Sequence, residues 1–189
     1  KGLSAAVEYL RRRLAGRVQV EALSAPLDQA RLEPRAVVFR IHPDRVPVQT
    51  AEAAVEFPGQ APKAPQVQPL LYPGEEAWIR AGGRLVVAVD GDYGPLRIVA
   101  GDPEEPFGKV LPVWPGVRRI EGEKPMALAG PDVQAMEAIL IRGEHPVAAR
   151  RMMDQGELIV LACPDAFANG RIAAADHLPL LEHLAGGAR

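Results

Sequence analysis

The chain has 189 residues, of which 48% are hydrophobic and 24% charged, and its formal net charge is −2. These values are typical of one globular domain, and the lack of a basic excess argues against a nucleic-acid partner. The single cysteine, Cys163, excludes a disulfide within the chain. The sequence also contains no run of about 18 apolar residues, the length that a membrane-spanning helix requires.

The first part of the chain carries one helical pattern and two extended ones. Apolar residues recur at helical spacing over 2–15, which predicts an amphipathic helix ending at Gly16. Alternation over 18–22 predicts a short strand, and the apolar run 36–41 predicts a second, more central one. Residues 42–73 are rich in proline, which removes backbone donors, so we expect a long loop or insertion there.

The middle of the chain returns to regular structure. A short helix over 75–81 ends at a glycine pair and leads into 84–89, the clearest buried strand in the sequence. This order of elements predicts a mainly parallel sheet covered by helices. Residues 90–131 are rich in glycine and proline, and 96–100 and 117–120 are candidate short strands within them.

Beyond residue 137 the pattern predicts strands followed by a helix. Residues 138–142 form one strand, and 147–152 and 157–162 flank a turn-like Asp-Gln-Gly segment. We favour a hairpin for this pair, with a helix over 147–155 as the alternative. The chain then ends in a helical region over about 170–185.

Three blocks of the sequence resemble one bacterial family. They are the opening helix and strand, the stretch from Trp78 to Val87, and the stretch from Gly156 to Asp165 with Asn169 and Asp176-His177 after it. Together they resemble the family catalogued as domain of unknown function 4350, whose members commonly carry Asp-Asn where this chain has Asp176-His177. The resemblance implies a class I glutamine amidotransferase-like fold beside transmembrane helices.

The expected fold is therefore a single α/β domain over residues 1–189. It is a three-layer domain of flavodoxin-like or amidotransferase-like type, with a mainly parallel sheet and a C-terminal β-hairpin. The proline-rich residues 42–73 are a loop or insertion in this domain.

Asp165, Asn169, Asp176 and His177 are the candidate binding residues. One interpretation is a small polar site, because α/β folds bind ligands at the carboxyl ends of their strands. In the structural interpretation, Asp165 shapes the turn after the strand and Asn169 caps the last helix. Asp176 then pairs with an arginine or caps, and His177 forms hydrogen bonds at a helix end. We favour the structural interpretation.

No catalytic, metal or cofactor site is expected. A nucleophilic cysteine of the amidotransferase type sits on a turn flanked by glycines, whereas Cys163 lies between Ala162 and Pro164. Pro164 has no N–H to offer an oxyanion, so a buried structural cysteine is the favoured interpretation. The histidines and Cys163 supply no three-ligand metal cluster at a recognisable spacing.

These observations lead to an expected function without catalysis. We expect a binding or assembly module of a bacterial membrane-anchored protein, whose partners are other membrane-associated proteins. The chain starts at Lys1 inside a helical pattern, so the anchor is expected outside this fragment, with the domain on the extracytoplasmic side. We expect no nucleic-acid or direct lipid binding. The alternatives are an amidotransferase-like hydrolase with an unfamiliar active site and a small-ligand sensor at the strand-end edge.

Overall fold

The computed structural model describes residues 3–15, 19–21, 32–41, 69–109, 111 and 113–186. Its helices are α1 (Ser4–Arg13), α2 (Pro73–Arg80), α3 (Pro131–Gln134) and α4 (His177–Ala185), with a 3-10 turn, η2, at Pro164–Phe167. Its strands are β1 (Val37–Ile41), β2 (Arg84–Ala88), β3 (Arg97–Ala100), β4 (Phe107–Lys109), β5 (Met126–Ala129), β6 (Glu137–Arg142), β7 (His145–Met153) and β8 (Gly156–Leu161).

The main sheet is mixed rather than mainly parallel. Its strand order is β1-β2-β8-β7-β6-β4, and only the first three strands run parallel to one another. The pairs β8–β7, β7–β6 and β6–β4 are antiparallel, and β3 and β5 form a separate antiparallel pair. The expected parallel sheet is thus correct for one side of the domain. On the other side, short turns join β6, β7 and β8, and such turns produce antiparallel neighbours.

The hairpin predicted near the C-terminus is present as β7 and β8, and the alternative helix over 147–155 is wrong. Its turn contains Asp154, whose φ of 52° lies in the left-handed region that turns favour for Asp and Asn. The hairpin is more than a decoration of the sheet. Strand β8 lies between β2 and β7, and every one of its residues is buried.

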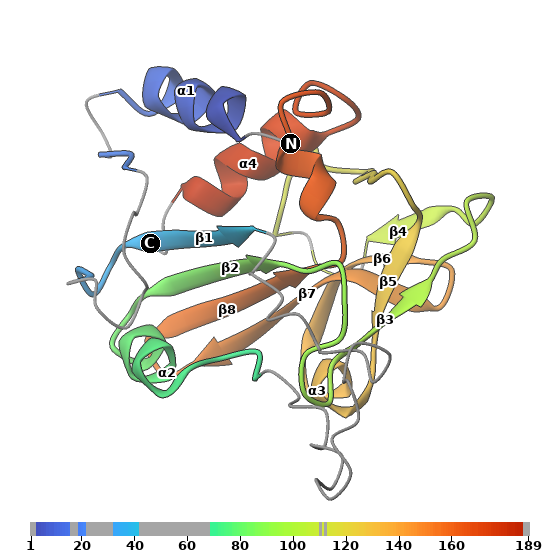
Figure 1. Ribbon diagram of the computed structural model, residues 1–189, viewed down its shortest axis with the longest axis horizontal. Coiled ribbons are helices and arrows are strands. Elements are labelled where there is room, and N and C mark those ends of the chain that lie inside the picture. The colour runs from blue at the N-terminus through green and yellow to red at the C-terminus, as the bar shows by residue number, and fades with distance from the viewer. Residues whose placement is uncertain are drawn as a thin grey trace, which may run out of the picture.

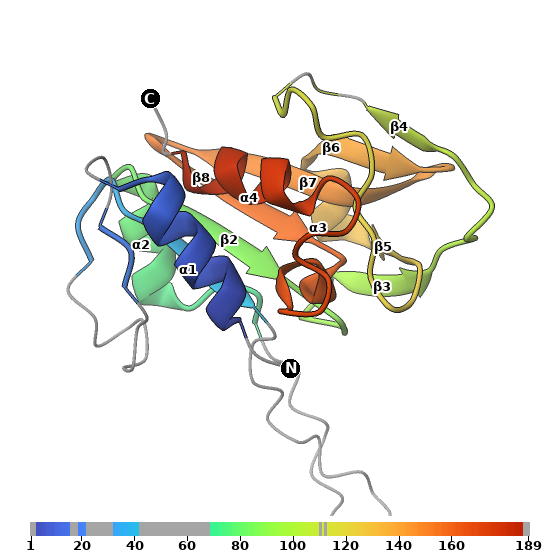
Figure 2. The same ribbon diagram turned by 90° about the horizontal axis from the view of Figure 1, so that it is seen from above.

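Helices cover both faces of the sheet, as Figures 1 and 2 show. Helices α1 and α4 lie side by side on one face, and α2 and α3 lie on the other. Alternate residues of β2 therefore enter two cores. Val86 packs with residues of α1 and α4, whereas Leu85 and Val87 pack with residues of α2 and α3. Burial on both sides explains why this strand is a continuous apolar run in the sequence.

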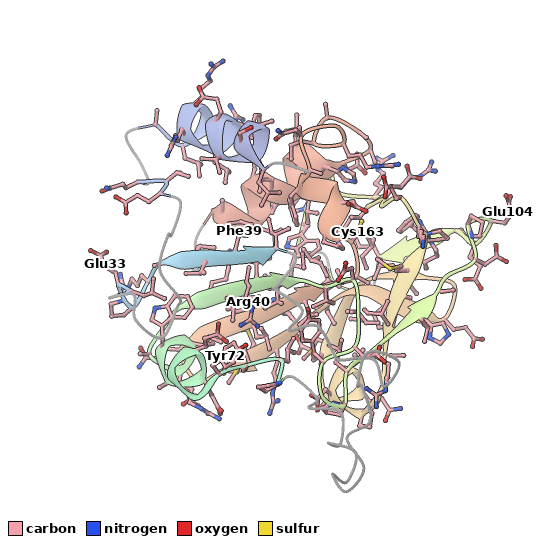
Figure 3. All side chains as sticks on the ribbon, viewed as in Figure 1. Glu33, Phe39, Arg40, Tyr72, Glu104 and Cys163 are labelled. Atoms are coloured by element: carbon pink, nitrogen blue, oxygen red, sulfur yellow. The ribbon has the colours of Figure 1, made fainter. Side chains whose placement is uncertain are left out.

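Strand β1 shows the same division with one apolar and one charged side chain. Phe39 points towards α1 and α4, and Arg40 points to the opposite side of the sheet (Figure 3). The Arg40 guanidinium donates to both carboxylate oxygens of Glu75 at 2.6 and 2.8 Å, and it lies 5.7 Å from the centre of the Tyr72 ring. This ion pair ties the edge strand to α2.

Among the residues that the structure describes, two of the predicted strands are not formed. Residues 19–21, the described part of the strand expected over 18–22, have no regular structure. Residues 117–120 are also irregular, and backbone N–H groups there find side-chain acceptors near the start of α4 instead of a neighbouring strand. A backbone donor needs a partner, but that partner does not have to be a strand.

The predicted C-terminal helix is shorter than the range 170–185. Residues 168–176 form turns, and α4 begins at His177. Pro179 consequently falls in the first helical turn, where its missing N–H breaks no intrahelical bond. Of the proline-rich stretch, residues 42–68 lie outside the described residues.

Candidate functional site

The four candidate residues follow β8 at its carboxyl end, but they do not converge on one pocket. Asp165 lies in η2 and is half-buried, Asn169 follows in the turns, and Asp176 and His177 lie at the start of α4. The side chains of the last three form hydrogen bonds to other segments of the same chain.

Asn169 caps the first helix rather than the last one. Its Oδ1 accepts a hydrogen bond from the backbone N–H of Ala5 at 2.8 Å, and its Nδ2 donates to Ser4 Oγ at 3.0 Å. The residue at the N-cap position of α1 is Leu3, which forms no side-chain cap. The free N–H groups of a helix start require acceptors, and here a residue 164 positions away supplies one.

Replacing Asn169 with alanine is expected to lower the free energy of unfolding by about 1 kcal/mol, the usual cost of a lost cap. The loss should arise at α1, so the amides of its first turn should exchange with solvent faster than those of α4. Urea unfolding and hydrogen exchange measure both effects. Asn169→Asp is the matched control, because it keeps an acceptor oxygen for Ala5 N–H. An unchanged stability in Asn169→Ala would contradict the capping role.

Asp176 fastens a distant segment to the start of α4. Its Oδ2 accepts hydrogen bonds from the backbone N–H groups of Arg118 at 2.7 Å and Arg119 at 2.9 Å, and its own N–H donates to Arg119 O at 3.3 Å. Asp176 occupies the N-cap position of α4 but forms no side-chain cap there. The expected capping role is therefore wrong, and the arginines with which Asp176 interacts contribute backbone N–H groups.

His177 is fully buried and joins two segments. Its Nε2 lies 3.0 Å from the backbone N of Glu121, which is a donor, so Nε2 accepts and the proton resides on Nδ1. Nδ1 then donates to the carbonyl oxygen of Arg171 at 2.7 Å. Burial lowers the pKa of His177, and the hydrogen bond to the Arg171 carbonyl opposes this effect. The geometry requires the neutral ring.

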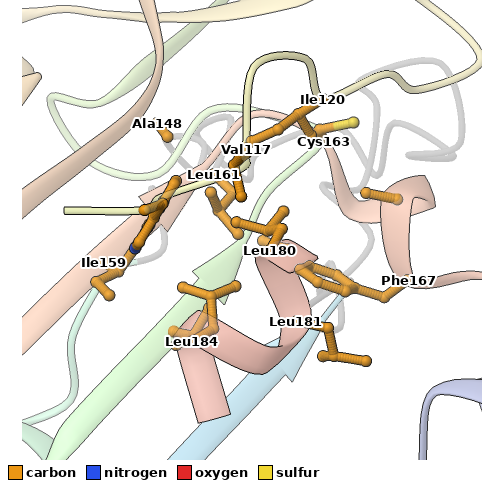
Figure 4. Close-up of a cluster of buried hydrophobic side chains, with 14 of the residues drawn as sticks. Val117, Ile120, Ala148, Ile159, Leu161, Cys163, Phe167, Leu180, Leu181 and Leu184 are labelled. Atoms are coloured by element: carbon orange, nitrogen blue, oxygen red, sulfur yellow. The ribbon is translucent and has the colours of Figure 1, made fainter. Parts of the chain in front are cut away.

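Residues 113–122, called the cover segment from here on, contact α4 and pack in the core on the same face of the sheet. Trp114, Val117 and Ile120 of this segment are buried in the core that includes Leu161 and Leu180. Figure 4 shows Val117 and Ile120 in this cluster, close to Leu161 and Cys163. The ring of His183, farther along α4, contacts the same segment, with its Nε2 2.6 Å from Pro115 O.

Cys163 lies beneath the end of the cover segment. Only 5% of its surface is exposed, and a Cβ placed on Gly122 would lie 3.2 Å from its Sγ, so the Gly122 backbone packs directly against the thiol. Desolvation by burial raises the pKa of Cys163 to about 12. A thiol that stays protonated and covered is a poor nucleophile, which agrees with the buried cysteine expected from the sequence.

A hollow of about 270 Å³ lies beside η2 and is called the strand-end hollow. Its lining brings together two carboxylates and a guanidinium, from Glu123, Asp165 and Arg171, with Ala168 and Gly170 between them. Asp165 is thus the one of the four candidates that borders it. The sequence analysis missed Glu123 and Arg171, because each lies in an irregular segment with no motif around it.

A second hollow, of about 290 Å³, lies at the opposite end of β2 and β8. Its charged side chains are engaged in structural roles. Arg84 Nε lies 2.8 Å from a carboxylate oxygen of Glu157, and Arg84 Nη1 donates to the carbonyl oxygens of His183 and Leu184. These carbonyls are at the end of α4, where a cation is favourable for the helix.

Three further observations concern the turn after β2, metal binding and membrane spans. Asp92 accepts a hydrogen bond from the backbone N–H of Ile98 at 2.9 Å, as a turn residue would. Within the described ranges, no group of three or more His, Cys, Asp or Glu side chains is arranged to hold a metal ion. Among the same residues, no helix is both long enough and apolar enough to cross a membrane.

Comparisons with known proteins show partial structural likenesses, of which two are described here. No family model matches the chain, and no curated protein matches it either. A cold-adapted β-galactosidase from Rahnella sp. R3 is similar over 46% of this chain and 17% of its own, at 17% identity and a TM-score of 0.31. A cytoplasmic protein from Salmonella typhimurium is similar over 61% of this chain and 59% of its own, at 13% identity and a TM-score of 0.39. This chain therefore spans less than two thirds of the length of either protein. The fold of this chain is an α/β domain with a mixed six-stranded sheet.

Proposed function

We propose that this domain is a non-catalytic binding or assembly module. The observation that carries the proposal is the use of its distinctive polar residues. Asn169, Asp176 and His177 bind backbone groups of α1, the cover segment and the turn before α4. These side chains use their hydrogen bonds to hold chain segments in place. They therefore support a function that is carried by the surface of the domain rather than by a group of catalytic residues.

We propose further that the domain is a relative of the family called domain of unknown function 4350, with an amidotransferase-like or flavodoxin-like ancestry. The parallel order β1-β2-β8 with helices on both faces supports this relationship, together with the three sequence blocks. Membrane segments outside residues 1–189 would then anchor it, with the domain on the extracytoplasmic side and membrane-associated proteins as its partners.

Replacing Cys163 with alanine is expected to leave any cellular activity intact and to cost about 1–2 kcal/mol of stability at most. The reason is the high pKa and the burial of the thiol. Iodoacetamide labelling at neutral pH should accordingly be slow compared with a cysteine peptide, and mass spectrometry measures its extent. Rapid stoichiometric labelling would instead reveal an activated thiolate and would favour the hydrolase interpretation.

The assembly role itself is tested in cells that express the full-length protein. It should fractionate with membranes. We propose the proline-rich residues 42–73 as part of the contact surface, so photo-crosslinkers placed there should capture discrete protein partners. A crosslinker at Glu104, an exposed position in the turn before β4, is the control for random collisions. A full-length protein found in the soluble fraction, with no spanning segment on either side of this domain, would remove the proposal of a membrane anchor.

The strand-end hollow favours a second candidate function, the sensing of a small polar ligand. Its two carboxylates and one guanidinium offer both signs of charge within one cavity. Asp165→Asn and Arg171→Gln should then retain stability but lose a cellular phenotype. Asn169→Ala, which loses stability through α1 and lies outside the hollow, is the control. If each variant loses the phenotype only in proportion to its loss of stability, the result would favour the assembly module over the ligand sensor.

A further inference from the structure

We propose that residues 113–122 form a pH-operated cover: protonation of His177 releases this segment from α4 and uncovers Cys163 and the adjoining core face, while the main sheet stays folded. This inference is independent of the binding or assembly role. It rests on how the segment is fastened to α4.

Besides the buried side chains of Trp114, Val117 and Ile120, the segment is held by side-chain contacts to its backbone groups. Asp176 accepts from the N–H groups of Arg118 and Arg119, and His177 accepts from that of Glu121. In the described part of the chain, the cover segment pairs with no strand, and its backbone hydrogen bond to another element joins Arg119 O to the N–H of Asp176. The segment therefore contributes no hydrogen bond to the sheet ladder.

Protonation reverses the role of the His177 ring. Imidazolium carries a proton on both nitrogens, so Nε2 would confront the Glu121 N–H as a second donor. The ring is fully buried, which leaves the displaced N–H and the new charge without water. The bond to the Arg171 carbonyl survives, since Nδ1 donates in both states. The contact that fails is specifically the one to the cover segment.

The charged groups around the ring do not cancel this effect. The carboxylates of Glu121 and Asp176 favour the imidazolium, and the guanidinium of Arg171 disfavours it. Burial is the strongest influence, and it holds the pKa of His177 below its ordinary value. The closed cover is therefore fully stable above about pH 6.5, the pKa of an unhindered histidine, and loses stability as the pH falls from there towards the lowered pKa.

Release of the segment would have a specific chemical consequence. Gly122 packs against the Cys163 thiol, and Val117 and Ile120 share its core cluster. Opening would expose this thiol together with apolar side chains of the sheet. Cys163 is the single cysteine of the chain, so its accessibility reports directly on the state of the cover.

The test measures thiol labelling of the 189-residue chain by 4,4′-dithiodipyridine, which reacts at acid pH, between about pH 7.5 and pH 5. Each rate is divided by that of the urea-unfolded chain at the same pH, which removes the intrinsic pH dependence of the thiol. The normalised rate should rise as the pH falls below about 6.5, by at most about tenfold per pH unit for one linked proton, and should level off at the lowered pKa of His177. His177→Gln retains an acceptor and a donor without titrating, so its normalised rate should stay flat.

His183→Gln is the matched control, because His183 contacts the same segment through Pro115 and should leave the pH dependence in place. Hydrogen exchange of the unaltered chain is a second measurement, which does not require any variant to fold. The amides of Arg118, Arg119 and Glu121 should lose protection at about pH 5.5 while those of β8 keep theirs. Simultaneous loss in β8, or the same pH dependence in His177→Gln, would overturn the proposal.

Discussion

Replacing Gly156 with alanine is expected to destabilise the domain by at least about 3 kcal/mol, the upper range for overpacking. A Cβ at this position would lie 1.8 Å from Ile79 O and 2.4 Å from Gly83 O. Both atoms belong to backbone, and the end of α2 is held there by the hydrogen bond from Gln155 N–H to Arg80 O at 3.3 Å. Because neither side can rotate away, α2 would have to separate from the first residue of β8.

Urea unfolding followed by circular dichroism measures this effect, and a natural control exists at the other end of α2. A Cβ on Gly74 would meet no atom within 4 Å, and the residue lies inside the first turn of the helix. Gly74→Ala should therefore be neutral or stabilising by up to about 1 kcal/mol, since alanine is the better helix former. Equal stability of the Gly156 and Gly74 variants would show that the approach of α2 to β8 is looser than described.

Replacing Phe167 with alanine is expected to cost about 3–5 kcal/mol, the usual range for a large aromatic side chain removed from a core. Phe167 is fully buried in η2, and its ring meets that of Phe39 edge to face, with centroids 6.1 Å apart. It packs in the cluster that joins β1 to α1 and α4. The truncation would leave a cavity between the edge strand and the turn that carries Asp165 and Asn169.

The same unfolding experiment with Phe167→Leu separates volume from aromatic geometry. Leucine refills much of the space, so the expected cost falls to about 1–2 kcal/mol. Since η2 positions the turn that leads to Asn169, Phe167→Ala should also accelerate hydrogen exchange in the first turn of α1. A loss of stability without any change in exchange at α1 would contradict this link between η2 and the capping of α1.

The regular elements were largely predictable from local patterns. The helical spacing over 2–15 is realised in α1, the apolar runs at 36–41 and 84–89 in β1 and β2, and the turn-like segment after 152 in the β7–β8 hairpin. Each of these signals lies within a few neighbouring residues. Amphipathic spacing predicts local conformation because the apolar side chains of one helix or strand face all point to the same side of the element. Turn residues are predictive because their own backbone preferences favour a turn.

Strand order and the partners of the polar residues were decided by tertiary structure. The strand β8 was predictable from the sequence, but its position between β2 and β7 depends on which apolar faces pack together in the folded domain. Residues 117–120 resemble a strand locally, yet the N–H groups of Arg118 and Arg119 donate to Asp176 instead of to a neighbouring strand.

Asn169 illustrates the physical reason. An amide beside a helical pattern is predicted to cap the helix that follows it, and it caps α1 instead, a helix 164 residues away. The sequence by itself determined which side chains can accept a hydrogen bond and where chain segments are helical or extended. Only the folded arrangement decided which donor each acceptor meets, because buried N–H groups take whichever partner packing brings within reach.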